Sequence, residues 1–283
     1  MTGPELDRYR RRKAYGNIML AGSLLAALSC VMLLFWILGY VFIKGIAGIN
    51  VAFFTELMTP VGVPGGGMAN AIVGSIIVVG MAALMAVPVG VATAIYLSEY
   101  GRGIFAETVR FVSDVLSGVP AIVAGIVAYA LVVKPMGRFS AFSGSVALAI
   151  LMLPIIIRSS EEIFKTVPDT LREASLALGV PRWRTILKIV LTTASGGLVT
   201  GIMLSVARVG GEAAPLLFTA FSNSFWSFRP DQPIATLPVQ LFNYAISPYD
   251  DWHQKAWAAA LVLIFMVLVM NILAKWFALR KRT

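Results

Sequence analysis

The stretch AWAAALVLIFMVLVMNILA, residues Ala256–Ala274, contains 19 residues and no charged side chain. At a rise of about 1.5 Å per residue, a helix of this length crosses a hydrocarbon core of about 30 Å. Further charge-free runs of at least this length are Ala14–Ile43, Leu57–Ser98, Val115–Val133, Phe139–Ile157 and Ile189–Ala207. One such run also fits a buried helix of a soluble protein, but six in one chain exclude that interpretation. The sequence therefore predicts an all-α, polytopic protein with six transmembrane helices.

The composition and the placement of the basic residues support the same class. Of the 283 residues, 58% are hydrophobic and 13% charged, whereas a soluble domain carries about 25% charged residues. With six spans and a cytosolic N-terminus, 17 of the 23 Lys and Arg residues fall in the N-tail, the second and fourth loops and the C-tail. This positive-inside bias predicts that both termini face the cytosol. It explains the net charge of +9 without a nucleic-acid partner.

The scarcity of cysteine and histidine excludes several kinds of site. Cys30 and His253 are the one cysteine and the one histidine of the chain, so a His/Cys metal cluster and an internal disulfide are ruled out. The basic N-terminus followed by an apolar run imitates a signal peptide. However, the run Ala14–Ile43 is far longer than a signal core of about 7–15 residues. We therefore expect it to remain as the first span.

The segment between the fourth and fifth spans, PDTLREASLALGVP (Pro168–Pro181), is rich in helix start and stop signals. Thr170 and Glu173 have the spacing of a capping box, in which each side chain binds a free N–H at the helix start. Gly179 is suited to the left-handed position after a helix, and Pro181 prevents continuation. These signals predict a two-turn helix ahead of the glycine.

The predicted helix, Thr170–Leu178, has one apolar face formed by Leu171, Ala174 and Leu178. A helix this short is unstable alone, so it must pack on something. Packing on its own membrane domain and packing on a partner protein are both compatible with the pattern.

A longer pattern decides between the two. The segment resembles the EAA loop of ABC importer permeases at Glu173, Ala174, Gly179, Ile189 and Leu191. Ser175 stands where Ala is usual in that loop, and Thr192 stands where Pro is usual. The resemblance implies a coupling helix that docks on an ATPase subunit, within a cytoplasmic loop at residues 158–188. The implied coupling residues are Leu171, Arg172, Glu173, Ala174, Leu178 and Gly179.

The chain lacks the motif that would hold ATP. It contains no G-x-x-x-x-G-K-[ST] sequence and no Gly-Lys pair. We therefore expect no cofactor on this chain, no catalytic residue and no enzyme activity of its own, with ATP bound by a partner ATPase.

A charged pair, Arg208 and Glu212, interrupts the apolar sequence at the end of the fifth span. On a continuous helix these residues share a face and form an ion pair. If the helix begins at Ile189, Arg208 lies about 28 Å along it, near the outer boundary. If the helix begins in the cytosol and continues through Pro215, Arg208 lies deeper. A charge near the membrane interior is costly and indicates function, and the guanidinium fork matches two oxygens of an oxyanion.

The surroundings of this pair resemble a known family. Ala207-Arg208-x-x-Gly211-Glu212 is similar to a pattern shared by oxyanion permeases, including those for sulfate and molybdate. Three further stretches resemble the phosphate branch of these permeases, the PstA-type family. They are Gly65–Asn70, Ala94–Gly101 and Ala214–Ala220. The likeness extends from about Phe54 to Asn271.

This resemblance implies a single transmembrane permease domain over residues 1–283, with a MetI-like core at about 69–277 and the first span as an added flank. It also implies a bacterial inner-membrane importer for inorganic phosphate, with Arg208 and Glu212 on the substrate pathway. The implied partners are a second permease (PstC-type), two ATPase subunits (PstB-type), a phosphate-binding protein (PstS-type) and the lipid bilayer.

Other functions remain open on the sequence alone. A sulfate or molybdate permease shares the Arg-x-x-Gly-Glu pattern. An ion-coupled secondary carrier would show inverted repeats with interrupted helices in both halves, which the sequence does not display, and it leaves the EAA-like loop without a role. An intramembrane enzyme would need a Ser/His or acidic pair inside the spans, and none is present.

Overall fold

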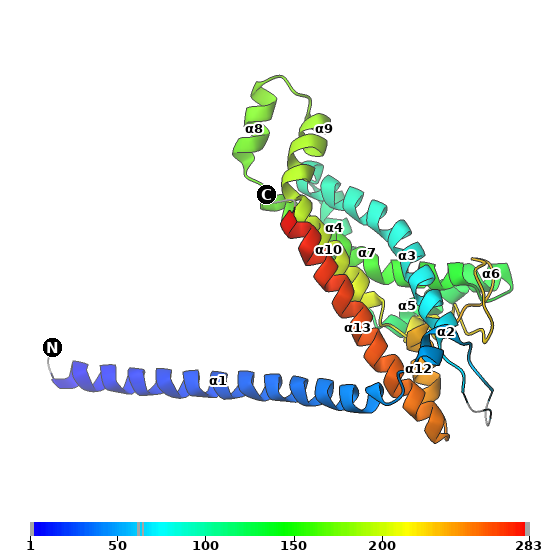
Figure 1. The fold of residues 1–283 in the computed structure, drawn as a ribbon. Helices are drawn as coiled ribbons and strands as arrows, with labels where there is room; N and C mark the ends of the chain where they lie inside the picture. Colours follow the sequence, from blue (N-terminus) through cyan, green and yellow to red (C-terminus); the bar gives the residue numbers. More distant parts are fainter. Residues whose placement is uncertain (1–2, 61–62, 64, 281–283) are drawn as a thin grey trace.

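The computed structural model describes residues 3–60, 63 and 65–280, and no β-strand occurs among them (Figure 1). Its helical segments, with η marking π-helical turns, are α1 (Gly3–Ile46), α2 (Val51–Thr55), α3 (Ala69–Ile95), η1 (Tyr96–Tyr100), α4 (Ile104–Ser117), α5 (Ala121–Ala128), η2 (Tyr129–Val133), α6 (Lys134–Met136), α7 (Ala141–Lys165), α8 (Asp169–Ala177), α9 (Arg182–Thr185), η3 (Ile186–Val190), α10 (Leu191–Val209), α11 (Ala214–Leu217), α12 (Leu237–Ala245) and α13 (Asp250–Arg280).

The predicted all-helical membrane architecture is confirmed, with one change in the third span. Helices long and apolar enough to cross a membrane are Arg8–Ile46, Ala69–Tyr100, Ala141–Lys165, Arg182–Val209 and Asp250–Leu273. The span predicted at Val115–Val133 is not a single continuous helix. In its place, Ile104–Ser117 and Ala121–Met136 meet at an angle of 108°. The two together account for the sixth span.

The bend of the third span has a local cause. The residues between the two helices are Gly118, Val119 and Pro120, and Pro120 is the N-cap residue of α5. Proline lacks a backbone N–H and obstructs the preceding helical turn, and glycine lowers helix stability. The N–H groups of Gly118 and Val119 bond instead to carbonyls three residues earlier. A charge-free run of sufficient length is therefore not sufficient evidence for a straight helix.

Helix α7 forms the centre of the molecule and packs on α3, α4, α5 and α10. Gly197 and Gly201 have the small-xxx-small spacing typical of close helix contacts, and they lie where α10 meets α7. A methyl group added at Gly201 would lie 2.9 Å from the Ser159 Oγ, and one at Gly197 would lie 3.0 Å from Ile163 Cγ2. Small residues on one helix let the two backbones approach in a membrane protein.

Helix α1 projects away from the other helices, as Figure 1 shows. It meets the body of the molecule near its C-terminal end, where Tyr40 packs edge-on against Trp257 of α13 with ring centroids 5.3 Å apart. Its most hydrophobic window is not buried by the rest of the chain. The first span is thus a flank of the core, as the sequence predicts.

The long segment between α10 and α13 folds back onto the start of α3. Asn70 donates its side-chain N–H to the Asn223 carbonyl at 2.9 Å, and Ser75 Oγ accepts from the Leu237 N–H at 2.7 Å. Helix α12 buries one face in the same region. The segment is therefore an ordered part of the permease body.

Candidate functional site

Helix α8 is the predicted segment between the fourth and fifth spans and lies within a residue of the expected bounds. Its N-cap residue is Pro168, which makes no side-chain cap; the Pro168 carbonyl accepts from the Leu171 N–H at 3.2 Å. The predicted capping box between Thr170 and Glu173 is therefore wrong. Because the helix begins one residue earlier, Thr170 lies inside the first turn, and the Asp169 carboxylate complements the positive end of the helix dipole.

The C-terminal end of α8 is confirmed. Gly179 has a φ of 75°, in the left-handed region. Its N–H donates to the Leu176 carbonyl at 2.9 Å, and the Val180 N–H donates to the Ser175 carbonyl at 3.2 Å. These two bonds form a Schellman motif, in which glycine is favoured because it lacks a Cβ.

Two faces of α8 have different environments. Leu178 is 83% exposed and Leu171 is 40% exposed, and Ala174 is exposed as well. Next to this stripe on the helix surface, Ser175 is buried, and its hydroxyl lies 2.8 Å from the Thr185 hydroxyl of α9. The helix is thus held to its own chain by one face, and the apolar face remains available to another protein.

Arg172 holds α8 to the C-terminal end of the second span, Ala69–Tyr100. Its guanidinium contacts the Glu99 carboxylate of η1 at 2.8 Å and Asp169 at 3.0 Å, and it donates to the Val167 and Phe164 carbonyls. The hydrogen bond to Glu99 raises the pKa of Arg172 above its ordinary value, so the side chain stays charged. Among the predicted coupling residues, Arg172 faces the permease body.

A polar pocket of about 490 Å³ lies between α8, α9 and the inner end of α3. Glu173 of the predicted coupling set lines it together with Arg172. Its other lining residues are Ser98, Glu99, Tyr100, Arg102, Lys165, Asp169, Leu176, Arg182, Thr185 and Ile186. Movement of α8 therefore changes the surroundings of both η1 and η3.

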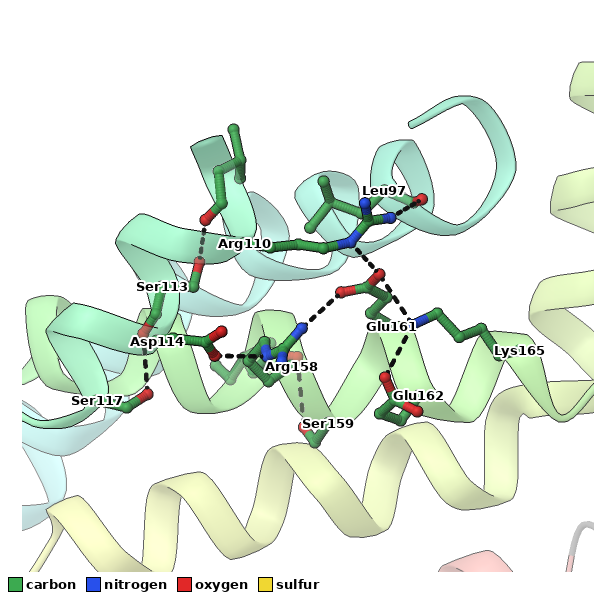
Figure 2. A network of polar contacts seen from close by, with 12 residues as sticks. Leu97, Arg110, Ser113, Asp114, Ser117, Arg158, Ser159, Glu161, Glu162 and Lys165 are labelled. Atoms are coloured by element: carbon green, nitrogen blue, oxygen red, sulfur yellow. Dashed lines mark hydrogen bonds and ion pairs between the residues drawn. The ribbon is translucent and has the colours of Figure 1, made fainter. Parts of the chain in front are cut away.

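A buried carboxylate, Glu161, binds three cationic side chains beside this region (Figure 2). Its oxygens lie 2.7 Å from Arg110 Nε, 3.1 Å from Lys165 Nζ and 3.4 Å from Arg158 Nη1, and the Glu161 side chain is fully buried. Arg110 also donates to the Leu97 carbonyl at 2.8 Å. A buried charge requires such pairing to offset its lost hydration. The cluster joins α4, α7 and η1.

The outer members of the cluster extend it along α4 and α7. Arg158 contacts Asp114 at 2.8 Å, and Lys165 contacts Glu162 at 2.9 Å. Sequence reasoning missed this cluster, because it treated Arg158 as the start of a loop, whereas α7 continues to Lys165. The spacing of Arg158, Glu161 and Lys165 at three and four residues was the available signal.

Arg208 and Glu212 do not share a helix. Helix α10 ends at Val209, and Gly210 and Gly211 follow it. The Glu212 N–H then closes a turn on the Val209 carbonyl at 3.1 Å. The predicted ion pair is therefore wrong: within the part of the chain that the structure describes, Arg208 has no hydrogen bond or ion pair. The two glycines favour the helix end, since glycine is a poor helix former.

Arg208 lies at the C-terminal end of α10, one residue before its last residue. The helical stretch that carries it begins at Arg182, not at Ile189. Its neighbours Val206 and Gly210 share a pocket with four residues of α13, Leu263, Met266, Val267 and Met270. These four residues belong to the span Asp250–Leu273. The helix that carries Arg208 ends at Val209 and does not continue through Pro215, so the condition for the deeper alternative is not met, and the depth of Arg208 stays a prediction.

Arg208 and Glu212 meet instead as two walls of one small pocket of about 110 Å³. The bend of the third span supplies Leu116, Ser117, Val119 and Ala121, and the remaining lining residues are Leu151, Ile155 and Val209. Arg208 is exposed and Glu212 is half-buried in the isolated chain. The structure thus brings the pair to the broken helix, an arrangement the sequence did not indicate.

Comparison with known proteins agrees with these features. A family model described as "Binding-protein-dependent transport system inner membrane component" matches residues 86–283. The phosphate transport system permease protein PstA of Yersinia pestis is 45% identical over 97% of this chain and 92% of the relative. The chain belongs to the PstA family of permeases. The PstA protein of Haemophilus influenzae is 41% identical over 97% of this chain and 98% of the relative.

Solved ABC transporters share the fold of this chain. The MetNI methionine transporter in an inward-facing conformation aligns with a TM-score of 0.62 at 17% identity, over 76% of this chain and 97% of that chain. A bacterial alginate transporter in complex with its periplasmic protein aligns with a TM-score of 0.66 at 12% identity, over 94% of this chain and 97% of that chain. This chain is therefore a multi-pass permease component with a MetI-like fold, in a binding-protein-dependent transport system of the inner membrane.

Proposed function

We propose that this chain is a permease subunit of an ATP-driven importer for inorganic phosphate. It forms the translocation pathway with a PstC-type permease, receives phosphate from a PstS-type protein and is driven by two PstB-type ATPases. The assignment of phosphate as the substrate rests on the near full-length identity of 45% and 41% to two PstA phosphate permeases. The proposed mechanism rests on the position of Arg208 in the pocket at the bend of the third span.

In this mechanism ATP is bound and hydrolysed by the separate ATPases, and the chain needs no cofactor or metal. Leu171, Ala174 and Leu178 present the exposed face of α8 to an ATPase subunit. Arg172 then passes the displacement of α8 to Glu99 at the inner end of the second span. Glu173 lies beside this contact in the same pocket, and the Gly179 turn fixes the direction in which α8 leaves the loop.

In the pathway, Arg208 replaces part of the hydration that a phosphate anion loses on entering the membrane. Its guanidinium fork can bind two anion oxygens at once. Glu212 lines the same pocket, and its negative charge weakens the grip on the anion enough for release. Because Arg208 is exposed in the isolated chain, the companion permease completes the site.

Competition during uptake tests the substrate. The complete four-component transporter is placed in vesicles with the binding protein outside, and uptake of labelled phosphate is followed with excess sulfate or molybdate. We expect neither oxyanion to reduce phosphate uptake. Equal competition by sulfate or molybdate would favour the alternative oxyanion permease, whose Arg-x-x-Gly-Glu pattern is the same. ATP-independent uptake would favour a secondary carrier.

Reporter fusions test the orientation. The proposal has both termini in the bacterial cytosol and residues 210–249 outside. A reporter fused at Thr283 and one inserted near Ser224 are therefore expected to give opposite activities. The same compartment for both would overturn the six-span topology.

A further inference from the structure

Phe221 has a backbone conformation that large side chains rarely adopt. Its φ is 59°, and among the described residues no other non-glycine residue has a positive φ. Its N–H donates to the Leu216 carbonyl at 3.0 Å and closes the turn after α11. Glycine or asparagine would adopt this left-handed conformation with less strain. The position therefore holds a bulky aromatic residue against the preference of its backbone.

The chain on both sides of Phe221 fixes this conformation. The Ala220 carbonyl accepts from the Ile234 N–H at 3.3 Å, and the Asn223 carbonyl accepts from the Asn70 side chain at 2.9 Å. Ser222 bonds to the Gln240 amide. Strain that the surroundings enforce in this way is concentrated at functional sites.

The Phe221 ring ends a ladder of three aromatic rings. It stacks on Phe139 with centroids 5.0 Å apart and planes at 20°, and Phe139 contacts Tyr129 at 6.2 Å. Phe139 lies in the turn between α6 and α7, and Tyr129 begins η2 directly after α5. The ladder joins the external ends of the third and fourth spans to the segment that follows Glu212.

The ladder stands above the pocket of Arg208. Helix α5 begins at Ala121, which lines that pocket, and Tyr129 follows its last residue. Eight residues of helix separate the two points by about 12 Å. Phe139 precedes α7, whose opposite end approaches α8, so the ladder lies on the external side (Figure 1). Phe221 is 53% exposed, so half of its ring surface is left for a neighbour.

We propose that Phe221 is the outer gate residue of the translocation pathway. Its ring, backed by Phe139 and Tyr129, closes the external end of the pathway against the companion permease subunit. This inference rests on the proposed phosphate pathway at Arg208. The strained backbone directs the Phe221 ring toward the companion subunit. A glycine at this position would relax the turn, but without a ring it would leave the external end of the pathway open.

Passive efflux of phosphate tests the gate. The complete transporter, without nucleotide, is reconstituted in vesicles loaded with labelled phosphate, and efflux is compared with that of empty vesicles. Phe221→Gly and Phe221→Asn both suit the left-handed backbone and remove the ring. We expect efflux to rise about tenfold, as expected from the loss of one aromatic contact that closes a gate. Phe221→Tyr should remain sealed.

Matched measurements separate a gate from a packing role. Phe225→Asn removes another exposed ring of the same segment, 74% exposed, and should leave the vesicles sealed. The melting temperature of Phe221→Gly should not fall, because backbone strain is relieved. Sealed vesicles for both Phe221→Gly and Phe221→Asn in an assembled complex would overturn the gate. So would a leak of equal size in Phe225→Asn.

A double variant distinguishes the gate from the proposed pathway. If Arg208→Gln removes the leak of Phe221→Gly, both residues lie on one phosphate pathway. If the leak persists unchanged, the gate stands and the assignment of Arg208 fails. If Phe221→Gly does not leak, the gate fails whatever the effect of Arg208→Gln on uptake.

Discussion

At the end of the molecule that carries α8, Glu161 contacts three cationic side chains and Arg172 contacts two carboxylates. In the pocket at the bend of the third span, Arg208 contacts no charged group among the described residues, although Glu212 lines the same pocket. The two regions contain the same kinds of side chain. The two regions differ in whether the described residues of this chain supply an ion-pair partner for each charged side chain.

The difference indicates two roles for charge in one permease. At the α8 end the ion pairs connect α4, α7, α8 and η1, and we propose that an ATPase subunit moves these elements together. In the proposed pathway, Arg208 has no charged partner among the described residues of its own chain, so we propose that it meets the companion subunit and a passing anion. A lone Arg in apolar surroundings is costly, which is why we expect the assembly to complete the site.

The largest effect is expected at Glu161. Glu161→Gln removes the charge that three cationic groups share and leaves a buried amide among them. We expect a loss of about 3 kcal/mol of stability, as for a broken buried ion pair, seen as a lower melting temperature of the purified complex. Glu162→Gln is the matched control, because Glu162 contacts Lys165 but is 65% exposed; an exposed pair contributes less than about 1 kcal/mol. Equal losses in the two variants would contradict the role given to the cluster.

Arg172 should give the next largest effect. Arg172→Gln removes the charged bonds to Glu99 and two carbonyls, at a cost of about 2 kcal/mol. We expect the complex to remain assembled and to hydrolyse ATP, with less phosphate transported per ATP. Glu99→Gln should reproduce this phenotype, since it removes the other half of the contact. Normal transport per ATP in both variants would show that α8 acts on the spans by another route.

Gly179 tests the turn that ends α8. Gly179→Val places a β-branched residue at a φ of 75°, where the left-handed conformation costs about 1–2 kcal/mol. Transport per ATP should fall, because α8 leaves the loop in a different direction. Gly179→Asn should behave closer to the native protein, as asparagine tolerates this region. Equal transport per ATP by the valine and asparagine variants would show that the left-handed turn at Gly179 has no part in coupling.

Ser175 should give the smallest effect. Ser175→Ala removes one neutral hydrogen bond to Thr185, with a cost of about 1 kcal/mol. Alanine is also the usual residue of EAA loops at this position, so we expect normal transport and a slightly lower melting temperature. A loss of transport would place Ser175 in the coupling contact itself.

The sequence was sufficient for features set by local or repeated signals. The long apolar runs, the small-residue contact at Gly197 and Gly201, and the left-handed stop at Gly179 are all present in the structure. The bend of the third span was missed because Gly118 and Pro120 lie inside a run with no charge to mark its end. Hydropathy measures whether a segment prefers lipid, and it carries no information about direction.

The site was predicted less completely, for a different physical reason. The cluster around Glu161 depends on Arg110, 51 residues away in the chain, and such a contact follows from how α4 packs on α7. The capping box failed because the helix start shifted by one residue, and the pair Arg208–Glu212 failed because two glycines end the helix between them. Arg208 was singled out because a charge near the membrane interior is costly, and its place on the pathway stays a prediction.

Phosphate uptake by the Arg208 variants tests the central claim most directly. The complete transporter carrying Arg208→Gln or Arg208→Lys is measured beside the unchanged protein, with copurification of the ATPases as the check on assembly. We expect Arg208→Gln to abolish uptake, and Arg208→Lys to retain part of it, because lysine keeps the charge without the bidentate fork. Uptake at the normal rate by an assembled Arg208→Gln complex would contradict the account and place the anion site elsewhere.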